Sequence, residues 1–389
     1  MGAKIHFTDT RKAFFKLQTW KLRKEIFLFN IMNSPWWSEW TKKRITWALK
    51  NNLPIEWLLK LTAFGQFCGG ESVDDCRKTV DRLFENNVTT ILDYSKEHGN
   101  ESTYDGAVDE LLKTVYEAKI NRKVSFAVFK FTSISDMDVL ESISNGNATA
   151  EQKSNFEKIK VRVNRLCKAA FENNVKILVD AEHSWIQNAI DAVTEDMMVE
   201  YNKQDFVVYN TLQLYRHDRL SYLKELHLRL KAKGVKVGLK IVRGAYMEQE
   251  RERAEQNGYP SPIQATKNDT DRDYDLALKY CMENLSDIAV CAGTHNQKSS
   301  ELLVELMQQN NIKENDSKVF FAQLLGMADH VSNNLGDAGF NVAKYVPYGK
   351  IKEAMPYLFR RVDENKSIAG EMSRELTIRK SELKRRKQN

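Results

Sequence analysis

The feature that most constrains the fold is a repeat of short apolar runs between residues 88 and 349. Each run is rich in β-branched and aromatic residues, and a stretch with helical signals follows it. Continuous apolar runs are typical of strands that are buried on both faces, as in a parallel sheet. The eight runs cover residues 88–95, 123–131, 176–182, 206–215, 236–246, 288–296, 318–326 and 341–349.

Eight parallel βα units close most naturally into a (β/α)₈ barrel of the TIM type. An open, doubly wound sheet is the alternative, but its nucleotide site needs a G-x-G-x-x-G turn after the first strand. The first run continues as LDYSKEHGN (92–100), which contains no such turn. The helical stretch 217–234 ends at Gly234, where a glycine commonly follows a helix. The sequence therefore favours an α/β barrel.

A helical region precedes the barrel. Apolar residues at helical spacing predict helices over residues 10–33, 39–51, 55–64 and 73–86, and Asn33-Ser34-Pro35 ends the first of them. Trp36, Trp37 and Trp40 could face a membrane, but packing against the next domain is the favoured interpretation. We expect an N-terminal helical region (1–86), the barrel (87–368) and a basic C-terminal tail (369–389).

Composition limits the class of protein. The net charge of +6 is modest, and we interpret the run RKSELKRRK (379–387) as a solvated helix end or tail rather than a contact with lipid or nucleic acid. Five cysteines without a Cys-x-x-Cys pair argue against disulfides and structural zinc. No secretory signal and no stretch of ~20 apolar residues occurs. We expect a cytoplasmic protein that binds neither a metal nor nucleic acid.

Polar residues gather at the carboxyl ends of the predicted strands, where barrel enzymes carry their active sites. A glycine at such an end, Gly244, commonly marks close backbone approach to a bound group. Arg360 and Arg361 on the last helix could clamp a carboxylate, although an ordinary solvated surface remains the alternative. The strand-end residues are Asp93, Tyr94, Lys130, Asp180, Glu182, Gln213, Tyr215, Lys240, Arg243, Gly244, Tyr246, Thr294, His295, Asn296, Gln323, Tyr345 and Tyr348.

Eight motifs together resemble the catalytic domain of proline dehydrogenases, in particular the stand-alone eukaryotic-like branch. The resemblance runs from about Phe67 to Ser367. The motifs are QFCGGE (66–71), LDYSKE (92–97), LVDAE (178–182), KIVRGAYMEQER (240–251), THN (294–296), FAQLLGMADH (321–330), KYVPYGK (344–350) and YLFRRVDEN (357–365).

The resemblance implies a flavoenzyme with noncovalent FAD at the mouth of the barrel. It implies oxidation of L-proline to Δ1-pyrroline-5-carboxylate by hydride transfer, the first step of proline catabolism to glutamate. Electrons would pass to a membrane quinone, which makes the protein a peripheral visitor to the bilayer. The chain is too short to contain the aldehyde dehydrogenase half of the bifunctional bacterial enzymes, so a separate pyrroline-5-carboxylate dehydrogenase is expected.

The same resemblance assigns roles to individual residues. Asp180 organises the basic groups of the site, and Lys240 stands where the bifunctional enzymes carry an arginine that reaches the flavin ring near N5. Because a lysine is a point charge without the guanidinium fork, the geometry of that contact is in doubt. The substrate-binding residues would be Lys130, Leu324, Tyr345, Tyr357, Arg360 and Arg361. The flavin-contacting residues would be Ala181, Gln213, Val242, Arg243, Gly244, Ala245, Tyr246, Thr294, His295, Asn296 and Glu364.

Two other functions remain open from the residues alone. A barrel aldolase could use Lys130 or Lys240 as a Schiff-base nucleophile. Alternatively, the tryptophan-rich helices and the basic tail could serve a scaffold without catalysis.

Overall fold

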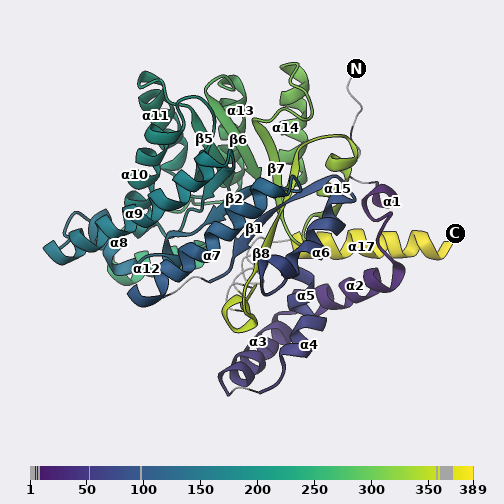
Figure 1. The fold of residues 1–389 in the computed structure, drawn as a ribbon. Coiled ribbons are helices and arrows are strands. Elements are labelled where there is room, and N and C mark those ends of the chain that lie inside the picture. Colours follow the sequence, from purple (N-terminus) through teal and green to yellow (C-terminus); the bar gives the residue numbers. More distant parts are fainter. Residues whose placement is uncertain are drawn as a thin grey trace.

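The strands form a closed barrel. The computed structural model describes residues 5, 7, 9–51, 53–96, 99–355, 358–359 and 371–388. Each strand pairs in parallel with the next along the chain, and the last pairs with the first (Figure 1). The (β/α)₈ prediction is confirmed, and an open sheet is excluded because no strand lies at an edge of this barrel. The strands are β1 (Val88–Tyr94), β2 (Val124–Phe129), β3 (Lys176–Val179), β4 (Val208–Gln213), β5 (Val237–Val242), β6 (Ile288–Gly293), β7 (Val319–Leu324) and β8 (Val342–Tyr348).

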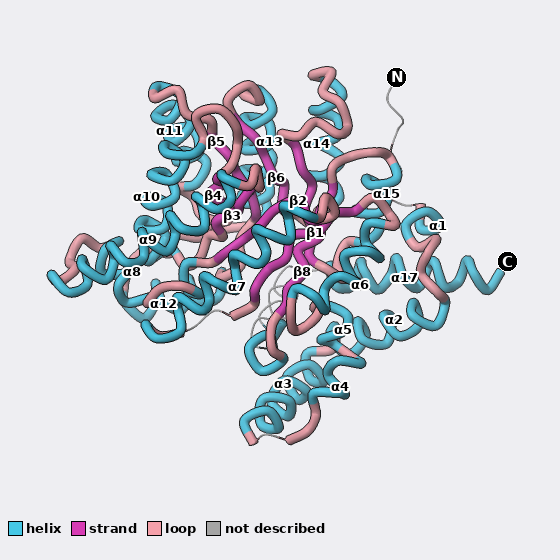
Figure 2. The backbone as a smooth tube through the Cα atoms, in the orientation of Figure 1, coloured by secondary structure: helices cyan, strands magenta, loops and turns pink. Residues whose placement is uncertain are grey.

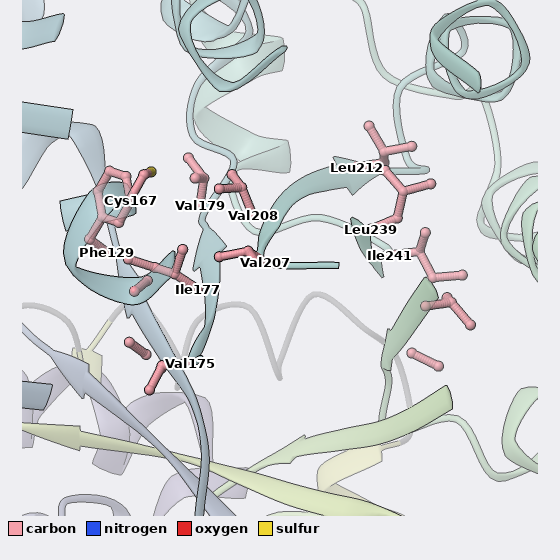
Figure 3. Close-up of a cluster of buried hydrophobic side chains, with 14 of the residues drawn as sticks. Phe129, Cys167, Val175, Ile177, Val179, Val207, Val208, Leu212, Leu239 and Ile241 are labelled. Carbon is pink, nitrogen blue, oxygen red and sulfur yellow. The ribbon is translucent and has the colours of Figure 1, made fainter. Parts of the chain in front are cut away.

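Both faces of the sheet are buried, which explains the continuous apolar runs. In β2, Phe126 and Val128 belong to the cluster that fills the barrel interior. Phe129 belongs instead to the larger cluster between the strands and the surrounding helices, together with Ile177 and Cys167 (Figure 3). Successive residues of a strand point to opposite faces, so each strand contributes to both layers.

Helices follow the strands and form the outer layer (Figure 2). Gly234 follows α11 with φ of 67°, as predicted for a glycine beyond a helix end. A short 3₁₀ helix, Phe131–Ser133, follows β2. The helices are α7 (Glu101–Ile120), α8 (Met137–Ser144), α9 (Ala150–Glu172), α10 (Ser184–Tyr201), α11 (Arg219–Ala232), α12 (Met247–Asn257), α13 (Lys267–Glu283), α14 (Gln297–Gln309) and α15 (Asp329–Asp337).

The N-terminal region is helical but more divided than the sequence predicts. The expected helix 10–33 breaks because the carbonyls of Phe14 and Leu17 accept hydrogen bonds, both of 2.6 Å, from the guanidinium of Arg386. The next helix begins earlier than predicted because Pro35 occupies its first turn. The helices are α1 (Thr10–Ala13), α2 (Thr19–Asn33), α3 (Pro35–Lys50), α4 (Glu56–Leu61), α5 (Ala63–Phe67) and α6 (Val73–Phe84).

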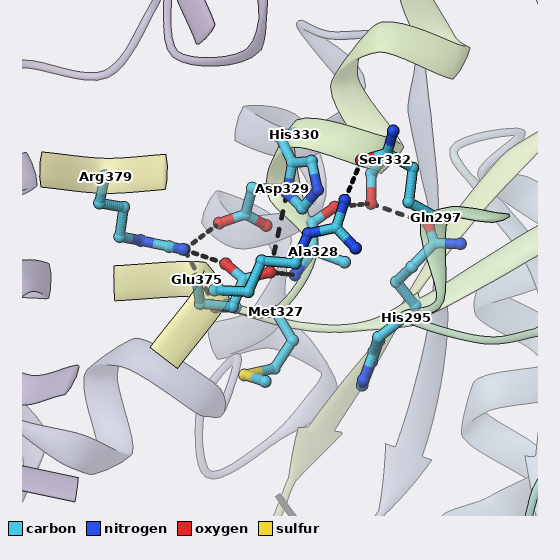
Figure 4. Close-up of polar contacts among 12 residues, drawn as sticks. His295, Gln297, Met327, Ala328, Asp329, His330, Ser332, Glu375 and Arg379 are labelled. Carbon is cyan, nitrogen blue, oxygen red and sulfur yellow. Dashed lines mark hydrogen bonds and ion pairs between the residues drawn. The ribbon is translucent and has the colours of Figure 1, made fainter. Parts of the chain in front are cut away.

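The C-terminal helix α17 (Glu371–Gln388) lies beside α2 and is fixed to the barrel by a buried ion cluster (Figures 1 and 4). The guanidinium of Arg379 is 0% exposed and bonds Glu25 at 3.0 Å, Asp329 at 2.9 Å and Glu375. The Lys344 ammonium lies 2.9 Å from the other oxygen of Asp329. We call these five residues the anchor cluster. The predicted solvated tail is therefore wrong at Arg379, whereas the three domain boundaries stay predictions.

Two further sequence predictions can be compared with the structure. All five cysteines are free and buried. Trp40, predicted to pack against the next domain, is instead 46% exposed. The side chains of Trp36 and Trp37 lie outside the described part of the chain. Within that part, no helix is long and apolar enough to cross a bilayer.

Candidate active site

A pocket opens at the carboxyl ends of the strands, where the polar residues were predicted to gather. The side chain of Asn296 instead caps α14 by accepting from the backbone N–H of Lys298 at 2.9 Å. Tyr357, Arg360, Arg361 and Glu364 lie outside the described residues. The predicted residues that line the pocket are Lys130, Asp180, Ala181, Gln213, Lys240, Val242, Arg243, Gly244, Ala245, Tyr246, Thr294, His295, Leu324 and Tyr345.

The end of β3, together with β5 and β8, brings Asp180, Lys240 and Tyr345 together in the lining of this pocket. The Lys240 ammonium donates to Asp180 and, at 2.6 Å, to the hydroxyl of Tyr345. That hydroxyl donates to Asp180 Oδ1 at 3.0 Å. All three side chains are buried, so the hydrogen bonds between them satisfy polar groups that are largely removed from water.

A second buried ion pair lies in the same region. The Lys130 ammonium, directly after β2, lies 2.6 Å from Asp93 Oδ1 on β1. The sequence places Asp93 at a strand end, but the predicted site does not include it. The signal that could have included it is its position in the run LDYS, at the carboxyl end of the first strand. We call Asp93, Lys130, Asp180, Lys240 and Tyr345 the mouth cluster.

The environment fixes the charge of Asp180. Burial alone would raise the pKa of this carboxyl, but Lys240 and Lys130, with hydrogen bonds from Lys240 and Tyr345, bring it below its usual value. Burial, and then the charge of Asp180, raise the pKa of Tyr345 well above 10. The site therefore holds an ionised carboxylate beside a protonated phenol at neutral pH.

Gly244 is required by packing within the protein. Its φ is 144°, and a Cβ on this residue would lie 2.4 Å from the ring of Tyr215. The sequence predicted close approach to a bound group, and the structure shows close approach to an aromatic ring. Gln213 braces the same rim, because its amide donates to the carbonyl of Glu182 at 2.7 Å and accepts from the N–H of Ala245 at 3.2 Å.

The adjoining part of the rim, between the ends of β5 and β6, is built around Arg243. Its guanidinium donates to Asp271 at 2.6 Å, to Thr294 at 2.7 Å and to Ser299 at 2.9 Å. These bonds tie the end of β5 to the loop after β6. In that loop, Nε2 of His295 accepts from the backbone N–H of Leu324 at 3.1 Å, a bond that places the ring proton on Nδ1.

The lining fits the flavin that the resemblance implies. Ala181, Val242 and Leu324 supply apolar surface for a planar ring. The described lining carries the cations of Lys130, Lys240 and Arg243 against the single carboxylate of Asp180. A flavin gains negative charge on reduction, and fixed cations stabilise such charge. Each of these cofactor contacts stays a prediction.

Comparison with known proteins identifies the family. Residues 76–374 match the sequence profile described as "Proline dehydrogenase". The chain belongs to the proline dehydrogenase family. Proline dehydrogenase 1, mitochondrial, of Dictyostelium discoideum is 31% identical over 97% of this chain and 74% of its own length. Hydroxyproline dehydrogenase of Xenopus laevis is 30% identical over 96% of this chain and 88% of its own.

A solved structure shares the fold. Proline utilization A of Bdellovibrio bacteriovorus superimposes with a TM-score of 0.72 at 18% identity. The match covers 94% of this chain but only 40% of that longer protein.

The predicted cytoplasmic location is wrong. Relatives from Dictyostelium discoideum and Arabidopsis thaliana are named as mitochondrial proteins. The prediction rested on the unpaired cysteines and on finding neither a secretory signal nor a long apolar stretch. These features favour a reducing compartment, but they do not distinguish one such compartment from another.

Proposed function

We propose that this chain is an FAD-dependent proline dehydrogenase that oxidises L-proline to Δ1-pyrroline-5-carboxylate. The electrons pass to a membrane quinone, and a separate dehydrogenase oxidises the product. The observation that carries the proposal is the mouth cluster, two buried lysines and an ionised carboxylate at the carboxyl ends of the strands, in a member of this family. The family also favours this function over the aldolase and the scaffold.

The substrate is held by its carboxylate and its ring. The Lys130 ammonium, with Arg360 and Arg361, binds the carboxylate, because charge-assisted hydrogen bonds are the strongest available to it. Leu324, Tyr345 and Tyr357 pack around the apolar ring. The hydrogen bond from Tyr345 to Asp180, 3.0 Å long, fixes the orientation of that aromatic side chain.

The cationic surroundings also prepare the substrate for oxidation. The amine of proline must be neutral before C5 can lose a hydride, and nearby positive charges favour the deprotonated amine. Lys130 and Lys240 supply those charges from within the pocket. Asp180 holds Lys240 in place. Because C5 loses a hydride and not a proton, no base is needed to remove a proton from carbon.

FAD, when bound, supplies the acceptor for the hydride that leaves C5. The residues that hold it are on the rims: Ala181, Gln213, the segment 242–246, the segment 294–296 and Glu364. Lys240 lines the same pocket and would stabilise the negative charge of the reduced ring.

Hydroxyproline is the second candidate substrate. The observation that favours it is the match to the Xenopus laevis hydroxyproline dehydrogenase over 96% of this chain. The two substrates differ by one hydroxyl group, and Leu324, which this proposal packs against the ring, offers that hydroxyl no hydrogen bond.

The test is turnover of the purified protein with each substrate. L-Proline and trans-4-hydroxy-L-proline are supplied separately with FAD and either a soluble dye or a ubiquinone analogue. We expect faster turnover of L-proline, a cyclic imine product and reduction of the quinone. Faster turnover of hydroxyproline would change the substrate, and reduction of the dye but not the quinone would remove the proposed acceptor. No turnover of either substrate would contradict the function.

A further inference from the structure

Exposed apolar side chains gather in one part of the N-terminal region. Nine of the sixteen large apolar side chains that are exposed in the described structure lie between residues 15 and 61. Six of the seven tryptophans of the chain lie between residues 20 and 57. Scattered apolar side chains are ordinary on a protein surface, but a concentration of this kind marks an interaction site. The nine are Phe15, Trp20, Phe27, Trp40, Trp47, Leu53, Trp57, Leu58 and Leu61.

Helices α3 and α4 present much of this surface on an arm that projects from the barrel (Figures 1 and 2). One side of the arm is packed, since Leu49 and Leu59 belong to an apolar cluster with Ile351 and Met355. Those two residues follow β8, so the arm is attached beside the carboxyl ends of the strands. The exposed residues at helical spacing on α3 and α4 form what we call the arm face: Lys43, Arg44, Trp47, Trp57, Leu58 and Leu61.

The positive charge of the chain is concentrated in the same region. Residues 10–61 contain eleven Lys or Arg and three Glu, whereas the whole chain has a net charge of only +6. The remainder of the protein is therefore slightly negative. Lysine and arginine next to exposed indole rings suit a membrane interface, where aromatic rings lie at the level of the headgroups and cations contact lipid phosphates.

We propose that the arm face docks on the surface of an anionic lipid bilayer. A protein partner fits less well, because lysine is depleted from the centre of protein interfaces. The arm lies on the surface without crossing it, since no helix of the described chain can span a bilayer. The inference rests on the proposed function at one point only. An arm docked on the bilayer would bring the barrel mouth close to the membrane quinone that this function requires.

Vesicle flotation of the full chain tests this surface without measuring turnover. The vesicles are phosphatidylcholine alone, or phosphatidylcholine mixed equally with phosphatidylglycerol. Each basic residue near an anionic surface contributes roughly five-fold to binding, so K43A/R44A should bind the anionic vesicles about 25-fold more weakly. W47A/W57A should lose about ten-fold or more, because less apolar area is buried. Wild-type tryptophan emission should shift to the blue on binding.

Matched variants separate the arm face from general surface effects. K153A/K158A removes two exposed lysines from α9, and Y116A/I120A removes two exposed apolar side chains from α7. Both should bind vesicles as the wild type does.

The proposal is overturned if wild-type protein does not bind anionic vesicles at low salt, or if these controls lose as much binding as the arm variants. It is also overturned if W47A/W57A abolishes a dimer in solution while vesicle binding is retained. Because dye-coupled turnover is measured separately, failure of this proposal leaves the enzymatic one standing.

Discussion

The mouth cluster and the anchor cluster are both buried ion networks, but they differ in what their cations face. Lys240 and Arg379 are 5% and 0% exposed, so burial alone does not separate them. The Arg379 guanidinium is surrounded by three carboxylates and the carbonyl of Gly326. Lys240 and Lys130 line a pocket instead. A buried cation enclosed by protein partners stabilises the fold, whereas one that faces an opening is available to a ligand.

The pKa values of Glu25 in the anchor cluster and of Asp180 in the mouth cluster shift in opposite directions. Burial raises the pKa of Glu25, and Arg379 does not reverse this because its charge is shared with Asp329 and Glu375. Burial also acts on Asp180, but two lysines bring its pKa below the usual value. Asp329 of the anchor cluster behaves like Asp180, because Lys344 and Arg379 overcome the effect of burial and bring its pKa below the usual value. The anchor cluster has three carboxylates for two cations, whereas the mouth cluster has two of each.

The largest expected effect is on stability. R379M would leave the buried carboxylates of Glu25 and Glu375 without their shared cation, and breaking a buried ion pair costs about 3–5 kcal/mol. We expect that loss in the free energy of unfolding, measured by urea titration, with turnover per folded molecule within a few-fold of wild type. K380M, at an exposed position of the same helix, is the control and should unfold as the wild type does. If R379M lost turnover without losing stability, the comparison would fail.

K240M should have the opposite effect. Removing a fixed cation from the site should lower kcat about 10²-fold, because on the proposed mechanism that charge stabilises the negative charge that the flavin gains. The free energy of unfolding should fall less than in R379M, since water can enter the pocket. Flavin content should fall more than the affinity for a proline-like carboxylic acid. Wild-type turnover and flavin content in K240M would show that the lysine has no role at the cofactor.

K130M should separate substrate binding from chemistry within the mouth cluster. Losing one charge-assisted hydrogen bond to a carboxylate should weaken binding of a proline analogue about ten-fold. Lys123, on the surface one residue before β2, provides the matched variant K123M, which should bind the analogue normally. The affinity of each variant for the analogue is measured by titration. Equal affinities in the two variants would show that Lys130 does not bind the substrate carboxylate.

The smallest effect concerns His330, which lies 3.7 Å from Glu375 in the anchor cluster region. Burial lowers the pKa of His330 below its usual 6.5, against the opposing charge of Glu375. The unfolded chain therefore binds this proton more readily, so the free energy of unfolding should fall as the pH drops through 6.5. H330Q should remove up to ~1.4 kcal/mol per pH unit from that slope. Stability is measured as the urea midpoint between pH 7.5 and 5.5. If its slope against pH were the same in H330Q and wild type, His330 would not be the residue that causes the pH dependence.

The sequence predicted the barrel because strands buried on both faces leave a continuous apolar signal. It predicted most of the pocket for the same reason, since polar residues stand out where such runs end. It did not predict the role of Gly244, because the Tyr215 ring that fills its Cβ position belongs to the turn after β4, 29 residues earlier in the chain.

The anchor cluster was beyond sequence reasoning. Arg379 lies in a run of basic residues, which is usually a solvated surface, and its partner Glu25 is 354 residues away in the chain. The break in the helix at residues 14–18 also depends on a distant residue, because Arg386 of the C-terminal helix donates hydrogen bonds to the carbonyls there. Long-range ion pairs and hydrogen bonds leave no local pattern in a sequence.

The most direct test of the central claim is the visible absorbance spectrum of the purified protein under anaerobic conditions. We predict flavin bands that bleach when L-proline is added, because in the proposed function the mouth cluster would hold the substrate beside bound FAD. K240M should bleach more slowly, whereas R379M, where it folds, should bleach normally. A colourless protein that cannot be reconstituted with FAD, or a bound flavin that L-proline does not reduce, would contradict the account.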